Sequence, residues 1–186
     1  MEQPDIVKSR RSDGKERTYR TRRTWIRIME ILLVAAVLAA LFFGWFRPVR
    51  ITGDSMEPAL ADGEIVLCDR LARYWKLPSR GDMIAFSTGE GVFIKRIVAL
   101  PGERVEIVDG AVFINSVPLD EGLYAHGGVD SLSPLTVPSG SGFVLGDNRI
   151  KIYDSRLEAV GCIPYSEITG VPRVRISPVV RWTVFF

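Results

Sequence analysis

The chain has 186 residues, which is enough for one domain with a hydrophobic core and a separate anchoring segment. Its 24 Lys and Arg against 22 Asp and Glu leave a formal net charge of +2, which is too small to indicate nucleic-acid binding. One histidine and two cysteines, not clustered at ligand spacing, do not fit a metal site. We therefore expect no metal, no cofactor and no nucleic-acid partner.

The first 24 residues are polar and charged and show no apolar period, so we expect them to be disordered. Nine of the 24 Lys and Arg lie within the first 27 residues. A basic tail directly before an apolar segment is typical of the cytoplasmic side of a membrane anchor, because Lys and Arg stay on that side. A nucleic-acid arm is the alternative interpretation of such a tail.

An uninterrupted apolar run from Ile31 to Phe46 predicts a transmembrane anchor over residues 25–47. The run ends in bulky residues, whereas a cleaved signal peptide, the alternative, would end in small ones. We therefore expect a retained single-pass anchor in the inner or plasma membrane, in contact with lipid. The N-terminal tail is then cytoplasmic, and residues 48–186 form an extracytoplasmic domain.

Residues 48–186 contain many short apolar segments separated by Gly- and Pro-containing turns, which predicts a mainly β, antiparallel domain. The pair Asp109-Gly110 is a strong signal for a two-residue hairpin. Residues 71–77 fit either a helical turn or a loop, and residues 120–133 a glycine-rich loop. The expected strands are 64–68, 83–86, 92–100, 104–108, 111–114, 117–119, 135–137, 142–145, 159–163, 171–176 and 179–186.

Three further features have more than one interpretation. Cys68 and Cys162 lie in apolar segments, so we favour buried free thiols over a disulfide, although an extracytoplasmic location would permit one. The only histidine, His126, lies in a glycine-rich loop and is expected to be solvated. The apolar C-terminal segment 179–186 fits a membrane-interface contact as well as a final strand.

Ser55 and Lys95 are the candidate catalytic residues. With the only histidine in a loop, a Ser-His-Asp triad is disfavoured, and a Ser/Lys pair is the economical choice for acyl transfer. A lysine acts as a base only when neutral, and its unperturbed pKa is ~10.4. Lys95 lies in the apolar segment 92–98, where desolvation would lower the pKa of its amine. The alternative is a strand-edge lysine and an ordinary turn serine.

Four motifs in order after one anchor resemble those of bacterial type I signal peptidases. The stretch at residues 53–60 resembles the nucleophile motif, residues 80–86 the next strand motif, and residues 94–103 the lysine motif. Residues 146–149 and 154–156 resemble the C-terminal motif. The resemblance covers about residues 50–170 and implies the compact form of the signal-peptidase fold, since the chain has room for only a short connection before the last motif.

The resemblance implies a membrane-bound serine endopeptidase that cleaves signal-peptide-bearing preproteins after small residues at −3 and −1. Ser55 would be the nucleophile, its backbone N–H an oxyanion donor, and Lys95 the general base. An extended substrate would add to strand edges. The residues implied to support the site are Arg96, Gly146, Asp147, Asn148, Asp154, Ser155 and Arg156. Those implied to form the shallow apolar wall for substrate are Ile51, Met56, Leu60, Phe93 and Ile94; the alternative is that they are core residues.

The chain departs from the family pattern at two positions. Gly53 stands where one branch of the family has a serine that donates to the oxyanion, so the second donor is unassigned. Ile152 stands where a serine usually orients the lysine amine; we expect Ile152 to increase desolvation and Tyr153, Ser155 or water to hold the amine. Because of these departures, the alternative to an active peptidase is an inactive relative of the family that has a binding or assembly role. A self-cleaving repressor-type protease is disfavoured by the anchor.

Overall fold

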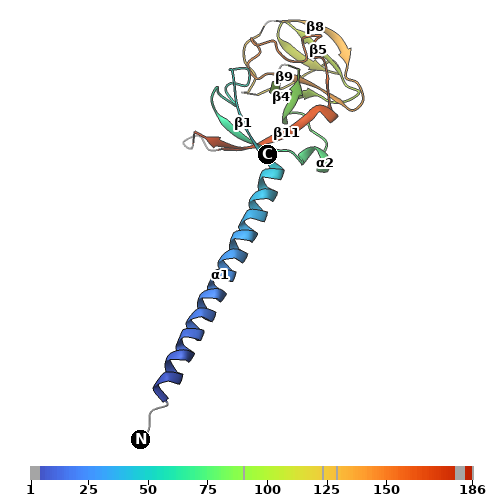
Figure 1. Ribbon diagram of the computed structural model, residues 1–186. Coiled ribbons are helices and arrows are strands. Elements are labelled where there is room, and N and C mark those ends of the chain that lie inside the picture. Colours follow the sequence, from blue (N-terminus) through green and yellow to red (C-terminus); the bar gives the residue numbers. More distant parts are fainter. Residues whose placement is uncertain (1–4, 90, 123, 129, 179–182, 186) are drawn as a thin grey trace. The chain divides into compact units, whose positions relative to one another are not determined.

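The computed structural model describes residues 5–89, 91–122, 124–128, 130–178 and 183–185. The chain divides into two compact units, Met1–Gly44 and Trp45–Phe186. The first unit consists of a helix, and the second contains all the strands (Figure 1).

Helix α1 spans Asp5–Trp45. The prediction that residues 1–24 are disordered is therefore wrong from Asp5 onward. This segment contains no proline, and Lys, Arg and Glu are good helix formers that can extend a helix nucleated elsewhere. The part from Arg23 to Trp45 contains an 18-residue window with a mean hydropathy of 2.4, and by length and composition this part can cross a membrane. The helix ends at Trp45 and not at residue 47, because Phe46 begins a strand.

The larger sheet of the second unit has eight strands in the order β1-β2-β11-β3-β4-β9-β10, with β12 paired to β11. All its pairings are antiparallel, as the sequence predicts. The bounds are β1 Phe46–Arg50, β2 Ile65–Asp69, β3 Met83–Thr88, β4 Gly91–Ala99, β9 Ser141–Leu145, β10 Ile163–Pro164, β11 Ile168–Ser177 and β12 Thr183–Val184.

The smaller sheet has four antiparallel strands in the order β7-β6-β5-β8. They are β5 Arg104–Val108, β6 Ala111–Ile114, β7 Val117–Pro118 and β8 Leu132–Thr136. Asp109 and Gly110 close the hairpin between β5 and β6 with φ values of 47° and 82°, which confirms the predicted turn. In Figure 1, β5 and β8 lie at one end of this unit, β1, β11 and α2 at the other, and β4 and β9 between them.

Several predicted elements differ from the observed ones. Residues 71–77 contain the short helix α2, Ala72–Trp75. The predicted strand 159–163 is wrong, since residues 159–162 form a turn and a bend and only Ile163–Pro164 pair with β9; the φ of 59° at Gly161 does not suit a strand. Of the predicted strand 179–186, only Thr183–Val184 is a strand, and residues 179–182 and 186 lie outside the described residues. A single turn of 3-10 helix, η1, spans Tyr165–Glu167.

Three clusters of buried side chains form the core of the second unit. One fills the space between the smaller sheet and β9, and includes Val105 and Phe143. A second lies around β2, β3 and the loop that follows β1, and includes Met56 and Leu60. The third joins β3, β4 and β10. Strand β4 contributes to all three, so a residue on β4 is held on several sides.

Candidate active site

Ser55 lies in the loop that connects β1 to β2, residues 51–64. The base of this loop is closed by two backbone hydrogen bonds, from Ile51 N–H to the Glu64 carbonyl at 2.8 Å and from Gly63 N–H to the Ile51 carbonyl at 3.0 Å. Gly53 has a φ of 88°, a left-handed conformation that favours glycine, and its N–H donates to Asp62 Oδ1 at 2.8 Å. These bonds hold the serine in a closed turn of fixed shape.

A buried ion pair secures the far side of the same loop. Arg175 on β11 lies 3.1 Å from Glu64 (Nε to Oε2), and its guanidinium also donates to the Ala59 carbonyl. Both ion-pair partners are buried. The sequence contains no signal for this pair, because the two residues are far apart in the chain and neither belongs to a motif.

Lys95 lies in the middle of β4, opposite Ile84 of β3, and is completely buried. Its Nζ has no hydrogen-bond partner among the described residues. Burial lowers the pKa of the amine to about 8, although the carboxylates of Asp154, Asp147 and Asp54 act in the opposite direction. The burial of Lys95 agrees with the expected desolvation, and with a pKa of about 8 a substantial part of the amine is neutral near pH 8.

Gly146 brings the serine loop and the lysine amine to one point. A Cβ atom placed on Gly146 would lie 2.6 Å from the Ser55 carbonyl oxygen and 3.5 Å from Lys95 Nζ. The next residues fasten the loop: Asn148 N–H donates to the Ser55 carbonyl at 3.1 Å, and Asn148 Nδ2 donates to the Asp54 carbonyl at 3.3 Å. Only glycine permits this close approach of the two backbones, which accounts for its place in the motif.

Arg96 and Asp147 form a two-bonded ion pair beside Lys95. Arg96 Nε and Nη2 donate to the two carboxylate oxygens of Asp147 at 2.8 Å and 2.6 Å, and Nη1 donates to the Gly81 carbonyl at 2.8 Å. The guanidinium also lies over the ring of Tyr124, 4.4 Å from its centroid. This arrangement fixes Asp147, and with it the segment that follows Gly146.

Arg156 organises the end of the C-terminal motif. It donates to both oxygens of Asp154, to Asp130 and to the carbonyls of Arg149 and Lys151. Asp154 Oδ2 in turn accepts the Gly146 N–H at 3.1 Å. The implied structural role of this pair therefore agrees with its position, since a chain of bonds leads from Arg156 to Gly146.

The motif comparison missed two further ion pairs. Arg149 is buried and donates to Glu121 from both Nη atoms, and its Nε donates to the Gly146 carbonyl at 2.7 Å. Lys151 Nζ lies 3.3 Å from Asp54 Oδ2, next to the serine. The residue types alone could not reveal these partners, because Glu121 lies in an expected glycine-rich loop and Lys151 in the atypical part of the last motif.

The residues expected to form the apolar wall lie in two groups. Ile51, Met56, Leu60 and Ile94 are buried in the same cluster, beside the serine loop. Phe93 packs against a different cluster and stacks on Tyr153, with ring centroids 4.5 Å apart. Strand β4 pairs with β9 only at Arg96, Ile97 and Ala99. Its first residues, 91–95, are thus paired on the β3 side alone among the described residues.

The expected substitutes for the missing lysine-orienting serine do not hold the amine. Ile152 is 48% exposed, so the expectation that it adds to desolvation is not supported. Ser155 Oγ accepts the Val144 N–H at 2.9 Å, and Tyr153 stacks on Phe93. Lys95 is instead desolvated by its central position in β4. Ser155 supports the site by fixing the strand that leads to Gly146.

The backbone N–H of Ser55 donates no hydrogen bond within the described residues, which leaves it available to an incoming oxygen. Gly53 offers no side chain, and a Cβ atom placed on it would meet nothing within 4 Å. Cys68 and Cys162 are both free, as expected; Cys68 is buried and Cys162 half-buried. Burial raises the pKa of the Cys68 thiol to about 12, so this thiol is not a nucleophile at neutral pH.

Comparisons with known proteins identify the family of this chain. The family model for signal peptidase, peptidase S26, matches residues 22–177. A probable signal peptidase I-1 of Synechocystis sp. is 35% identical over 163 residues, which is 82% of this chain and 82% of the relative. Signal peptidase I S of Bacillus subtilis (strain 168) is 32% identical over 165 residues, which is 83% of this chain and 88% of the relative.

A solved structure is also similar. The crystal structure of a signal peptidase I from Enterococcus faecalis V583 is 32% identical, with a TM-score of 0.42, and the match covers 52% of this chain and 97% of that chain. The family match spans the whole candidate site, from Ile51 to Arg156. The identities to curated relatives hold over more than four fifths of this chain. This chain therefore belongs to the signal peptidase family, peptidase S26, and is a serine peptidase.

Proposed function

We propose that this protein is a membrane-bound endopeptidase that removes signal peptides from exported preproteins by means of a Ser55/Lys95 dyad. The observation that carries the proposal is the approach of the serine loop to a buried lysine amine at Gly146. A lysine amine without a hydrogen-bond partner and with a pKa of about 8 has the property that a general base needs at neutral to mildly alkaline pH.

In the first half of the reaction, neutral Lys95 takes the proton of Ser55 Oγ while that oxygen attacks the carbonyl carbon of the scissile peptide bond. The Ser55 N–H donates to the oxyanion that forms. The Lys95 ammonium then gives its proton to the leaving nitrogen, and the C–N bond breaks. The product is a Ser55 ester of the signal peptide, and the mature protein leaves with a free amino group.

In the second half, a water molecule attacks the ester carbonyl carbon, and Lys95 takes one of its protons. When the bond to Ser55 Oγ breaks, the ammonium returns that proton to the oxygen. The signal peptide leaves as a carboxylic acid that gives its proton to solvent, and both residues regain their starting states. Arg96, Asp147, Asp154 and Arg156 act as positioning residues, because their bonds fix the segment around Gly146.

Substrate recognition would use the unpaired first part of β4 together with the apolar wall. An extended signal peptide would add its backbone to residues 91–95, and its −1 and −3 side chains would meet the cluster containing Ile51, Met56, Leu60 and Ile94. The proposed preference for small residues at −3 and −1 is supported by the aliphatic character of this cluster.

We further propose that residues within 23–45 form a single-pass anchor in the inner or plasma membrane. The basic residues 1–24 would form the cytoplasmic tail, and residues 48–186 the extracytoplasmic catalytic domain. This topology puts the serine loop, which begins soon after the helix ends at Trp45, near the membrane face where a signal peptide emerges.

The test is cleavage of a purified preprotein in detergent by the full chain and by two variants. Ser55→Ala and Lys95→Ala should each lower kcat/KM by at least about a thousandfold, since loss of a nucleophile or its base removes the covalent route. A mass spectrum of the product should show cleavage after small residues at −3 and −1.

Lys76→Ala is the matched control, because Lys76 is exposed and lies outside the dyad; it should retain wild-type kcat/KM. Full activity in Lys95→Ala would exclude the dyad. A well-folded wild-type protein that binds preprotein without cleaving it would favour the alternative, an inactive binding or assembly factor.

A further inference from the structure

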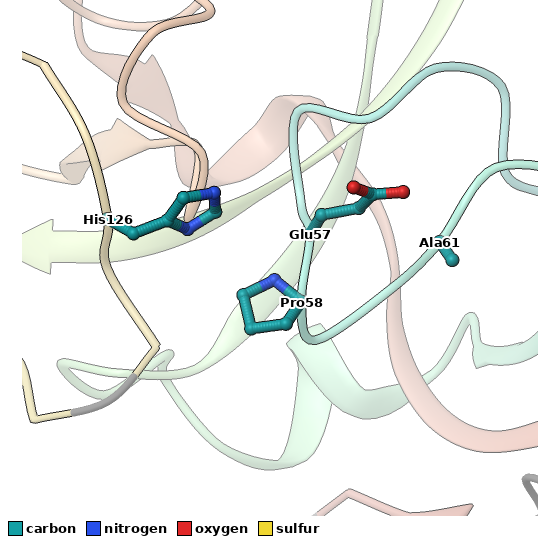
Figure 2. Close-up of a pocket in the computed structure, with 4 residues that line it drawn as sticks. All are labelled: Glu57, Pro58, Ala61 and His126. Atoms are coloured by element: carbon teal, nitrogen blue, oxygen red, sulfur yellow. The ribbon is translucent and has the colours of Figure 1, made fainter.

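A recess lies next to the serine loop. Its volume is about 400 Å³, and it is lined by Glu57, Pro58, Ala61 and His126 (Figure 2). The first three residues come from the serine loop, whereas His126 comes from a separate segment that faces them. In Figure 2 the imidazole points toward Glu57 and Pro58, and the Glu57 carboxylate extends toward Ala61. This volume is sufficient for one long side chain.

The recess is connected to the serine through Asn148. Asn148 N–H donates to the Ser55 carbonyl, and Asn148 forms a parallel bridge with His126. His126 N–H donates to the Asp147 carbonyl at 3.0 Å, and the Arg149 N–H donates to the His126 carbonyl at 2.9 Å. Asn148 therefore lies between the serine and the histidine. A peptide that pairs with residues 91–95 and passes Ser55 toward Asn148 would next reach His126.

Within the recess, Glu57 is a carboxylate without a counter-charge. Four acidic residues of the surrounding site each face a cation: Asp54 faces Lys151, Glu121 faces Arg149, Asp147 faces Arg96, and Asp154 faces Arg156. Glu57 forms no ion pair with any described residue, although it is only half-exposed. A partly desolvated carboxylate gains most from a cation supplied by the ligand.

We infer that this recess is a subsite for a residue shortly after the scissile bond, and that Glu57 selects a basic side chain there. The inference rests on the proposed function, since it assumes that a peptide crosses Ser55. His126 forms the opposite wall and contacts the stem of the bound side chain. The subsite binds one of the first residues of the mature protein, whereas the apolar wall binds residues of the signal peptide.

The test uses one signal sequence followed by Lys, Gln or Glu at the first, second or third position after the scissile bond. The wild-type protein should cleave the Lys peptide with a kcat/KM about threefold to fivefold above that of the Glu peptide at one of these positions, as expected for a half-exposed ion pair. Glu57→Gln should abolish the difference, and Glu57→Lys should reverse it. Added salt should weaken the wild-type preference, because it screens the pair.

Glu106→Gln is the matched control, since it removes a carboxylate from β5 of the smaller sheet, and it should keep the wild-type preference. Thermal unfolding of each variant establishes that it is folded. Equal cleavage of all peptides by the wild-type protein, or a Lys preference that survives Glu57→Gln, would overturn the subsite and leave the proposed function intact. No cleavage of any peptide would overturn both.

Discussion

Lys95 combines complete burial with an amine that has no hydrogen-bond partner among the described residues. Most buried polar groups have partners, because an unsatisfied one costs free energy. Here desolvation disfavours the ammonium form and lowers the pKa to about 8, while Asp154, Asp147 and Asp54 oppose the shift. The strand position alone thus gives the side chain the protonation behaviour of a base.

This predicts that kcat/KM rises with pH through an apparent pKa near 8, as Lys95 loses its proton. Asp54→Asn should move this rise to lower pH, because the Asp54 charge favours the ammonium form. The measurement is the pH dependence of preprotein cleavage at constant ionic strength. Glu106→Gln, a change in the smaller sheet, should leave the profile in place. A profile that is flat between pH 6 and 10 would contradict the role of Lys95.

At the residue scale, the sequence identified both members of the proposed dyad and the apolar setting of the lysine. It could not identify the partners that hold them. Arg149 and Glu121, or Arg175 and Glu64, meet only because distant segments fold together. The expected role of Ile152 failed for the same reason: an apolar residue type does not fix whether a loop side chain faces inward.

At the scale of elements, the segment that follows β9 is the critical connection. Gly146 lies against the Ser55 carbonyl, and Asp147, Asn148 and Arg149 each bond to a different part of the domain. The position of the serine loop therefore depends on the position of β9, because this segment connects the two. A small displacement here moves the nucleophile relative to the amine.

Gly146→Ala should lower kcat/KM by about a hundredfold, because the added methyl group would lie 2.6 Å from a backbone oxygen and must push the serine loop away. The measurement is cleavage of a preprotein, with circular dichroism to verify the fold. Gly89→Ala is the control, since a Cβ atom there meets nothing within 4 Å. Equal activity of the two variants would show that the serine loop does not need this close approach.

Sequence patterns located most strands of the domain but missed β1 and misassigned residues 159–162. Strand β1 is short, contains Pro48 and follows an apolar helix without a break, so no turn signal separates the two elements. Residues 159–162 have strand-like composition, yet Gly161 adopts a positive φ that ends the run. The sheet order and the closeness of Ser55 to β9 depend on tertiary packing, which local patterns do not encode.

At the scale of the whole molecule, the site lowers stability. The pKa of Lys95 is about 8 in the folded protein against 10.5 in the unfolded chain. Below pH 8, folding must either bury the charged ammonium or remove its proton, and both cost free energy. The cost is on the order of 3 kcal/mol at neutral pH and disappears as pH rises toward 10.5.

The Lys95→Met protein should therefore have a higher free energy of unfolding than the wild-type protein at pH 7. Between pH 8 and 10.5 its free energy of unfolding should rise less than that of the wild-type protein. Met fills a similar volume without charge. The measurement is denaturant unfolding of the full chain in detergent at several pH values. Lys76→Met, at an exposed position, should behave like the wild-type protein. A less stable Lys95→Met protein at pH 7 would show that burying the amine is not costly.

The hydrogen bond between Asn148 and the Asp54 carbonyl joins residues 94 positions apart. Closing a loop of this length costs conformational entropy, which the packing of the whole domain must offset. In an unfolded chain the Lys95 amine is solvated, and with a pKa of 10.5 it is charged at neutral pH. Under the proposed mechanism, an incompletely folded chain is not a protease. Hydrolytic capacity then arises only with the finished domain, in which the buried amine and the serine loop meet at Gly146.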